Sequence, residues 1–282
     1  MLIGQGTGSG SGRIRHNGGT DQTATKIYNT GSPEDSDFGA VMLAGSHASS
    51  TLEVLAGSVD VSAFPGETSR YVTLTIRGGS VRTSDGCTLT TVALEGSGRL
   101  ADDSAITTLT MKGSSSIVTS GAMTTATIEG DASLDADSTI TTLKMSGNAA
   151  ARVTGAITTA NVDGNASLNA ESAITTLTSA DRGAVTMREG GSGTATTIYG
   201  SSLTIVNSSS ATYATLVMGT NSTLDLSESE AAVTVTADMA PGAGITIIDP
   251  MGRLAATVKP AGGGLQDIKK WTTKKGATID VT

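Results

Sequence analysis

Apolar and polar residues recur on a fixed period in the central part of the chain. In a four-residue segment that recurs there, an apolar residue is followed by two threonines and then by an aliphatic residue or alanine. The copies are Leu89–Val92, Ile106–Leu109, Met123–Ala126, Ile140–Leu143, Ile157–Ala160 and Ile174–Leu177, and their first positions give a constant 17-residue period. In the first five repeats another apolar residue follows, as at Met111, and then a glycine, as at Gly113. A repeat of fixed length indicates an array of stacked structural units.

Within each repeat the order of side chains predicts β-strands. Leu109-Thr110-Met111 and Ala126-Thr127-Ile128 alternate apolar and polar residues, which is the pattern of a strand with one buried face. Threonine favours extended backbone, and the glycine at a fixed offset interrupts each strand where the chain must turn. Glycine recurs too often for a long helix. The sequence therefore predicts an all-β fold.

The repeats must stack, because one repeat is too small to bury its own apolar side chains. In a β-solenoid (β-helix) each repeat forms one rung, and neighbouring rungs about 4.8 Å apart supply one another's backbone hydrogen bonds. We predict such a β-solenoid with 17-residue rungs, and weaker copies of the repeat occur near Tyr71 and Tyr213. The alternative is a turn of 34 residues made of two half-turns, because GDASLDADS at 130–138 matches GNASLNAES at 164–172.

Three segments follow from this pattern. Residues 1–50 form a Gly/Ser-rich arm and lead-in segment, residues 51–240 form the β-solenoid, and residues 241–282 form a small β-rich segment that serves as a cap or for attachment. The arm has too little apolar content to fold alone, so we expect it to be flexible and to become ordered on a partner surface.

The start of the chain lacks the basic and apolar regions of a secretory signal. No stretch approaches the roughly 18 apolar residues that cross a membrane. We therefore expect a protein that is made in a cytoplasm, reaches its destination by assembly or lysis, and has no membrane partner.

Composition narrows the kind of core. Aromatic residues make up only 2% of the chain, whereas a thick globular core of this size normally contains many large rings. Small residues suit a thin, layered core instead. The single cysteine, Cys87, excludes an intramolecular disulfide framework and a cysteine-rich zinc site, and we expect it to be a small core residue.

Charge separates the solenoid from the carboxy-terminal segment. Residues 51–240 carry 19 acidic and 9 basic residues, and residues 241–282 carry 3 acidic and 6 basic ones. An acidic body repels phosphates, which argues against a nucleic-acid partner. A basic cluster around one tryptophan is a candidate attachment site. The alternatives are that the basic residues are an ordinary solvated run of charges and that the tryptophan covers the last rung as a local cap. Its residues are Lys269, Lys270, Trp271, Lys274 and Lys275.

Candidate catalytic chemistry is sparse. His16 and His47 lie outside the repeat, and no metal-binding motif accompanies them. The pairs Asp102–Asp103 and Asp135/Asp137 resemble the carboxylates of glycosidases. The central rungs lack aromatic platforms for sugar rings, and aspartate is an ordinary residue at turns. We predict no enzymatic activity and assign no catalytic, cofactor-binding or metal-binding residue.

The paired threonines suggest a second kind of surface. Threonine ladders on a flat solenoid face bind ice in several antifreeze proteins. Adjacent threonines on a straight strand point to opposite sides, and the T-x-T column through Thr108 and Thr110 is interrupted by Lys144 and Asn161. We interpret the pairs as threonines stacked at a corner of the rung.

The Gly/Ser/Thr/Ala-rich repeats at 89–177, the start without a signal and the distinct terminal segments resemble β-solenoid virion proteins of bacteriophages, such as capsid decoration proteins, head fibres and tail spikes. The resemblance implies a structural protein of the virion, made in the host cytoplasm, that decorates or reinforces the capsid exterior. It also implies a homo-oligomer, with a trimer favoured, that contacts the major capsid protein or another virion protein. The alternatives are a bactofilin-like cytoskeletal β-helix, a bacterial surface adhesin, and a tail spike or fibre that binds host glycans.

Overall fold

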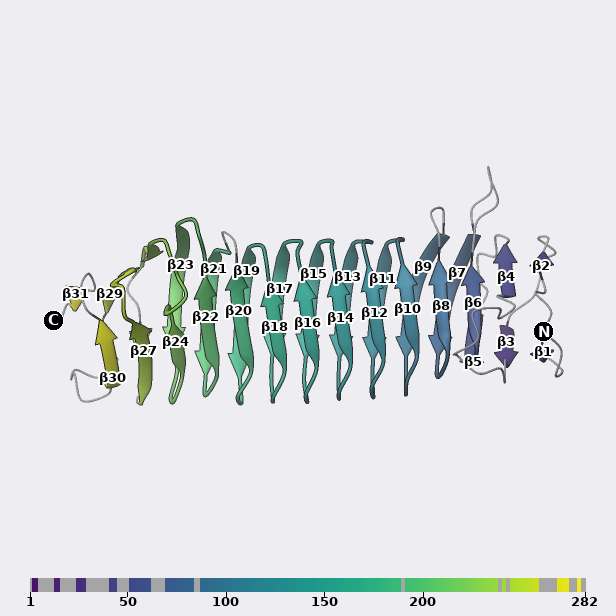
Figure 1. Ribbon diagram of the computed structural model, residues 1–282, viewed down its shortest axis with the longest axis horizontal. Coiled ribbons are helices and arrows are strands. Elements are labelled where there is room, and N and C mark those ends of the chain that lie inside the picture. The colour runs from purple at the N-terminus through teal and green to yellow at the C-terminus, as the bar shows by residue number, and fades with distance from the viewer. Residues whose placement is uncertain are drawn as a thin grey trace. The chain divides into compact units, whose positions relative to one another are not determined.

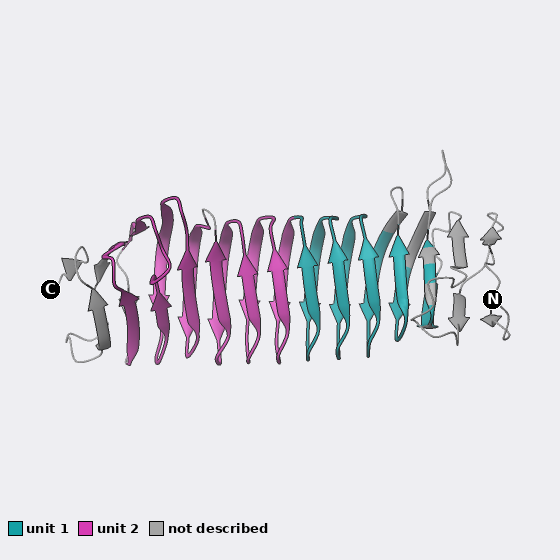
Figure 2. Cartoon of the chain, in the orientation of Figure 1, with its two compact units in different colours: residues 1–138 teal, residues 139–282 magenta. Residues whose placement is uncertain are grey.

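The computed structural model is all-β, and the part of the chain that it describes contains no helix. It describes residues 51–61, 69–83, 87–188, 191–237, 240–241 and 244–258, and the strands at 2–4, 13–15, 24–28, 41–44, 268–273 and 278–279. The strands are labelled in Figure 1. The chain divides into two compact units, unit 1 (residues 1–138) and unit 2 (residues 139–282), which are coloured in Figure 2.

Unit 1 consists of two parallel sheets whose strands alternate along the chain. The first sheet has the order β1 (Leu2–Gly4), β3 (Ala24–Tyr28), β5 (Thr51–Ala56), β7 (Ser69–Ile76), β9 (Cys87–Leu94), β11 (Ile106–Met111) and β13 (Met123–Ile128). The second has the order β2 (Arg13–Arg15), β4 (Val41–Ala44), β6 (Ser58–Val61), β8 (Ser80–Thr83), β10 (Arg99–Asp102), β12 (Ser116–Thr119) and β14 (Ser133–Ala136). One strand of each sheet makes one turn, so the unit is a β-solenoid.

Unit 2 repeats this arrangement. Its first sheet has the order β15 (Ile140–Met145), β17 (Ile157–Val162), β19 (Ile174–Ala180), β21 (Gly193–Tyr199), β23 (Ala211–Met218), β25 (Val233–Val235) and β28 (Leu254–Ala255), with β26 (Ala240–Pro241) also beside β23. Its second sheet has the order β16 (Ala150–Val153), β18 (Ser167–Ala170), β20 (Ala184–Arg188), β22 (Ser202–Val206), β24 (Thr223–Asp225), β27 (Ile245–Asp249) and β30 (Ile268–Thr273). A separate pair joins β29 (Thr257–Val258) and β31 (Thr278–Ile279).

The strand register fixes the length of a turn. Ile106 pairs with Leu89 on one side and with Met123 on the other, so the chain returns to the same sheet with a 17-residue period. In unit 2 the pairing of Ile157 with Ile174 has the same 17-residue spacing. The predicted 17-residue rung is therefore confirmed, and each rung contains two strands. Successive turns pair a large residue with a small one at Leu143 and Ala160, so alternation along this column does not require a 34-residue turn.

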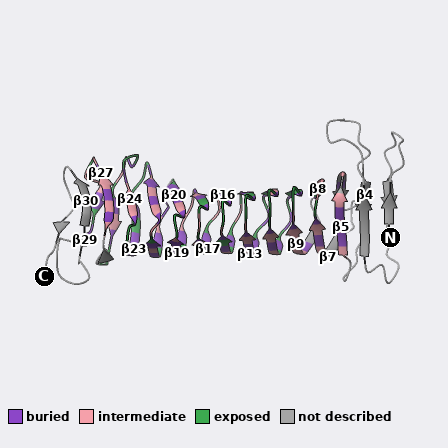
Figure 3. Cartoon of the chain, turned by 90° about the horizontal axis from the view of Figure 1, so that it is seen from below, coloured by how far each residue is buried: buried purple, intermediate pink, exposed green. Residues whose placement is uncertain are grey.

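The core runs between the two sheets, and its positions are those that the repeat predicts (Figure 3). In β11 the residues Ile106, Leu109 and Met111 are at most 1% exposed. Ile117 of β12 closes the turn from the other side at 2% exposed. Most interior positions of a turn hold aliphatic side chains or alanine, which explains how a chain so poor in aromatic residues forms a core.

Glycine is required where the first strand of a turn ends. Gly96 and Gly113 both have positive φ, at 60° and 74°, a conformation that side-chain-bearing residues rarely adopt. They also stack directly, because a Cβ at Gly113 would lie 2.9 Å from the carbonyl oxygen of Gly96. The glycine that marks each repeat therefore sets both the turn and the close approach of successive turns.

The paired threonines lie at a bend. In β11 Thr107 is exposed and Thr108 is half-buried, and both lie between the buried Ile106 and Leu109. Buried residues of a straight strand are two apart, so the three-residue step shows that the strand bends at the pair. The straight-strand rule that places adjacent side chains on opposite sides therefore does not apply at this pair, and the interpretation as a corner agrees with the bend.

Strand pairing is not confined to residues 51–240. Strands β1 to β4 belong to the two sheets of unit 1, and β27, β28 and β30 belong to those of unit 2. The roles assigned to the two terminal segments stay predictions. Cys87 lies in β9, but its side chain is outside the described part of the structure.

Candidate functional site

The first predicted carboxylate pair, Asp102–Asp103, lies at the end of β10, where successive side chains point to opposite sides. Asp102 points into the solenoid and is 2% exposed. Asp103, the next residue, is exposed, and its Oδ1 accepts a hydrogen bond from Ser120 Oγ at 3.0 Å. The two carboxylates therefore lie on opposite sides of the chain and do not face a common substrate position.

The second predicted pair lies on the outside of the second sheet. Asp135 in β14 is half-buried and Asp137 is exposed, with the buried Ala136 between them. The backbone N–H of Asp137 donates to the carbonyl oxygen of Thr119 at 2.9 Å, which places Asp137 at the turn that follows the strand. This is the ordinary position for an aspartate in a turn that the sequence suggested.

Asp102 belongs to a buried polar cluster inside unit 1. Thr83 Oγ1 donates to Asp102 Oδ1, and Ser104 Oγ donates to the same oxygen at 2.5 Å. Thr119 is the register partner of Asp102 on β12, and its Oγ1 accepts from the N–H of Gly121 at 3.0 Å. Asp102 Oδ2 has no hydrogen-bond partner. The cluster thus holds one carboxylate oxygen firmly and leaves the other unsatisfied.

Burial raises the pKa of the Asp102 carboxyl above its ordinary value of 3.8, and the hydrogen bonds from Ser104 and Thr83 only partly oppose this shift. The negative charge of Asp103 raises the pKa further. As the pH rises, the unfolded chain therefore loses this proton before the native chain does. The contribution of Asp102 to stability is greatest below about pH 3.8, falls above that value, and levels off once the pH exceeds the raised native pKa.

The variant Asp102→Asn tests this sign. Asparagine keeps an oxygen that accepts the hydrogen bonds of Thr83 and Ser104, and it removes the group that ionises. We expect the variant to be more stable than the wild type by about 1 kcal/mol at pH 7, because no unpaired charge is buried. The difference should be smaller at about pH 3.5, where Asp102 is mostly protonated in both native and unfolded chains. Urea denaturation followed by circular dichroism between these two pH values measures it.

Asp103→Asn is the matched control, because it removes an exposed carboxylate from the neighbouring position. It should change the free energy of unfolding by no more than about 0.5 kcal/mol. If Asp102→Asn were instead less stable than the wild type at pH 7, the carboxylate would be favourably ionised in the native chain, and the account of the cluster would be wrong.

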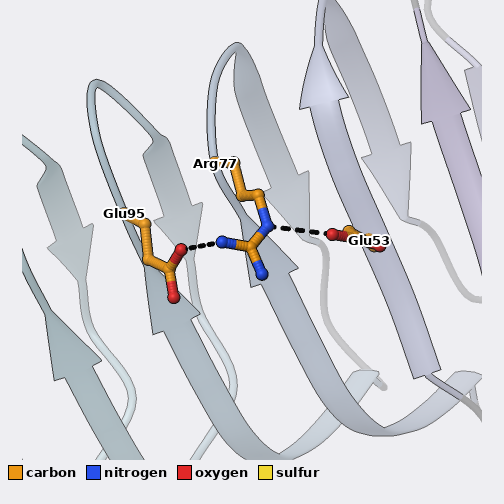
Figure 4. Close-up of polar contacts among 3 residues, drawn as sticks. All are labelled: Glu53, Arg77 and Glu95. Carbon is orange, nitrogen blue, oxygen red and sulfur yellow. Dashed lines mark hydrogen bonds and ion pairs between the residues drawn. The ribbon is translucent and has the colours of Figure 1, made fainter.

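Charged residues form a ladder on the outside of the first sheet in unit 1. Arg77 Nε lies 2.9 Å from Glu53 Oε1, and Arg77 Nη1 also contacts Glu95 Oε2 (Figure 4). Two turns further along the ladder, Lys112 Nζ lies 3.3 Å from Glu129 Oε2. The ion pairs join residues of different turns, so they hold neighbouring turns in register from the outside.

Unit 2 has polar ladders of its own. Arg152 Nε lies 2.9 Å from Glu171 Oε1, and Arg188 Nε donates to Asn169 Oδ1 at 3.1 Å. Asn165 Nδ2 donates to Asn148 Oδ1 at 3.2 Å. Exposed pairs of this kind contribute little stability individually. Each of them joins residues of different turns.

The predicted attachment residues fall at the end of unit 2. Lys269, Lys270 and Trp271 lie in β30, where Lys270 pairs with Thr246 and Trp271 with Ile247 of β27. Their side chains, and all of Lys274 and Lys275, are outside the described part of the structure. Attachment through these residues stays a prediction.

Within the residues that the structure describes, no group of three or more His, Cys, Asp or Glu side chains is placed to hold a metal ion. No helix in that part is long and apolar enough to cross a bilayer. Comparison of the chain with protein-family models, curated proteins and solved structures found no match. The functional proposal therefore rests on the sequence and on the geometry described above.

Proposed function

We propose that this chain is a non-enzymatic structural protein that decorates or reinforces the exterior of a bacteriophage virion. The observation that carries the proposal is the constant turn length of the central repeats, residues 89–177. Ser116 of β12 pairs with Arg99 in the turn before it and with Ser133 in the turn after it, at the same 17-residue spacing on both sides. Such a ladder resists deformation, because each turn is bonded to both neighbours.

The side chains of the solenoid serve this ladder. Interior positions stack aliphatic residues and alanine, and outer positions carry ion pairs between turns, such as those of Arg77 and Lys112. The acidic residues that suggested hydrolysis have structural surroundings instead: Asp102 is enclosed in the core, and Asp137 lies at a turn. A repetitive scaffold accounts for these features without a reaction.

Composition supports the virion setting. The small-residue repeats resemble those of β-solenoid virion proteins. The solenoid, residues 51–240, carries 19 acidic and 9 basic residues. A body with this excess of negative charge is suited to project into solvent, because like charges limit lateral aggregation. Attachment to the shell is then a task for the terminal segments, where the composition changes.

Electron microscopy of the purified chain in negative stain separates this function from its alternatives. A virion decoration protein should form discrete particles of uniform length that bind phage capsids. Continuous filaments would favour a bactofilin-like cytoskeletal function, and binding to host cells without binding to capsids would favour an adhesin. Degradation of host polysaccharide that Asp135→Asn abolishes would contradict the non-enzymatic assignment.

Two variants test attachment through the ends of the chain. Deleting residues 1–30 removes β1, β2 and β3 and should leave a β-rich protein. We expect it to bind particles at least about tenfold more weakly, because this segment is the proposed contact with the partner surface. Lys269→Glu combined with Lys270→Glu tests the basic end. Lys144→Glu, with half that change in charge, is the control at an exposed position inside the solenoid. Co-sedimentation with particles measures binding. If both end variants bind as the wild type does, attachment runs through the side of the solenoid instead.

A further inference from the structure

One face of unit 1 combines a flat array of small side chains with a balanced column of charges. We call the outer side of β7, β9, β11 and β13 the threonine face. Two columns of half-buried, uncharged residues run across it, with one residue of each column in each strand. They are Thr73, Thr91, Thr108 and Thr125 in one column and Thr75, Ala93, Thr110 and Thr127 in the other.

A third column borders these two on the same side of the sheet. It follows the ends of the strands and contains Arg77, Glu95, Lys112 and Glu129 in successive turns. The sign of the charge alternates along the column, and the two positive charges balance the two negative ones. The four charges of this column therefore sum to zero, on a chain whose net charge is −8.

The geometry of the uncharged columns restricts what can fit closely against them. Strands paired in register place identical side chains about 4.8 Å apart. β-Branched columns with this spacing pack closely against columns of the same spacing and form a dry contact between two sheets. The surface that matches a threonine column of this period is another β-ladder, and the threonine face of a second copy supplies one.

The charged column adds a requirement of symmetry. A two-fold axis parallel to the strands reverses the order of turns in the second copy but keeps the charged column on the same side of the contact. Arg77 then lies opposite Glu129 of the second copy, and Glu95 lies opposite Lys112. An alternating column of four charges is self-complementary in this arrangement, which is the condition for an isologous contact.

We propose that two copies of the chain pair through the threonine face of unit 1, about a two-fold axis parallel to the strands. The uncharged columns form the centre of the contact and the charged column forms one rim. This pairing does not depend on the virion setting. It differs from the threefold assembly expected from the sequence, because a closed trimer needs two different contact surfaces on each chain.

Lysine substitution tests the centre of the contact. Lys144 is exposed in β15 at the repeat position that Thr110 and Thr127 occupy in unit 1, so the fold accepts lysine there. Thr110→Lys combined with Thr127→Lys places four lysines in one contact. Ser116→Lys combined with Ser133→Lys is the matched control, because these residues pair on the outside of the second sheet.

Sedimentation equilibrium at about 1 to 100 μM measures the result, since a contact limited to four strands is small and is expected to be weak, with a dissociation constant on the order of micromolar. The masses of the wild type and the serine control should rise with concentration and approach twice 28.0 kDa at about 100 μM, and the threonine variant should remain at 28.0 kDa. Circular dichroism confirms that all three proteins keep the same β content.

A charge swap tests the symmetry. Lys112→Glu places Glu95 opposite a glutamate of the second copy, twice in each pair, and should weaken pairing about tenfold at low salt. Adding Glu95→Lys should restore pairing, because the lysine introduced at position 95 of one copy then faces the glutamate introduced at position 112 of the other. If these charges served only ion pairs within one chain, the double variant should not restore pairing. The swap places two positive charges side by side along the column, followed by two negative ones.

The pairing is overturned by any of four results. They are a wild-type mass of one chain or of three chains, a wild-type mass for the threonine variant, loss of pairing in the serine control, and failure of the charge swap to restore what Lys112→Glu removes.

Discussion

Deleting residues 106–122 is expected to leave a folded solenoid with one turn fewer. The deletion removes β11 and β12 together, which is one complete 17-residue turn. Met123 then follows Ala105 and takes the place of Ile106 beside Leu89, so every later strand returns to its own sheet. Because each turn contacts only its neighbours, loss of one interior turn should lower the melting temperature by no more than about 5 °C.

Deleting residues 106–114 should have the opposite result. It removes β11 alone, and β12 must then enter the first sheet, where a strand of six residues has been replaced by one of four. Every later strand is displaced into the other sheet, so the columns of buried residues no longer meet. We expect no cooperative unfolding transition for this variant in circular dichroism. If the 17-residue deletion also abolished folding while a 34-residue deletion did not, the turn length given by the register would be wrong.

A single methyl group at Gly121 is expected to be nearly as damaging. A Cβ at this position would lie 1.7 Å from the carbonyl oxygen of Ser104, which occupies the same place in the preceding turn. The backbone cannot move aside easily, because the N–H of Ser120 is bonded to Asp102 and the N–H of Gly121 is bonded to Thr119. Gly121→Ala should therefore lower the free energy of unfolding by about 3 kcal/mol, a shift of about 10 °C in melting temperature.

Ser138 provides the control for this variant. It occupies the same repeat position one turn after Gly121 and already carries a side chain. Ser138→Ala should change the melting temperature by no more than about 2 °C. Equal melting temperatures for Gly121→Ala and the wild type would show that the turns are not held as closely as the geometry indicates.

The core could be predicted from the sequence because a solenoid repeats each interior position once a turn. Leu100, Ile117 and Leu134 recur with the 17-residue period, and the same spacing makes them register partners in the second sheet. Periodicity alone therefore identified a column of contacts between distant residues. An ordinary globular core gives no such signal, since its contacts have no fixed spacing.

The turn length and the threonine bend needed the structure. Alternation of Leu143 and Ala160 is compatible with a large residue beside a small one in successive turns or with a turn twice as long, and only the register separates the two. The rule that adjacent side chains oppose each other holds for a straight strand, and the chain bends at Thr107 and Thr108. Spacing in the sequence does not report a bend.

The buried carboxyl could have been found from the sequence. Leu100 points inward and Ala101 outward, so the alternation predicts that Asp102 points inward. Aspartate is also an ordinary turn residue, so its type and its position in the strand favour different interpretations. The candidate attachment residues are a different case, because the described structure places Lys269, Lys270 and Trp271 in β30 without their side chains.

Cryo-electron microscopy of phage particles made with and without the gene tests the proposed function most directly. The proposal predicts regular extra density on the outside of the shell in the particles that contain the chain, and its absence in the particles that lack it. Within that density, strands about 4.8 Å apart should run across a narrow solenoid. Identical shells in the two preparations, with the chain found as filaments in the host cell, would contradict the proposal.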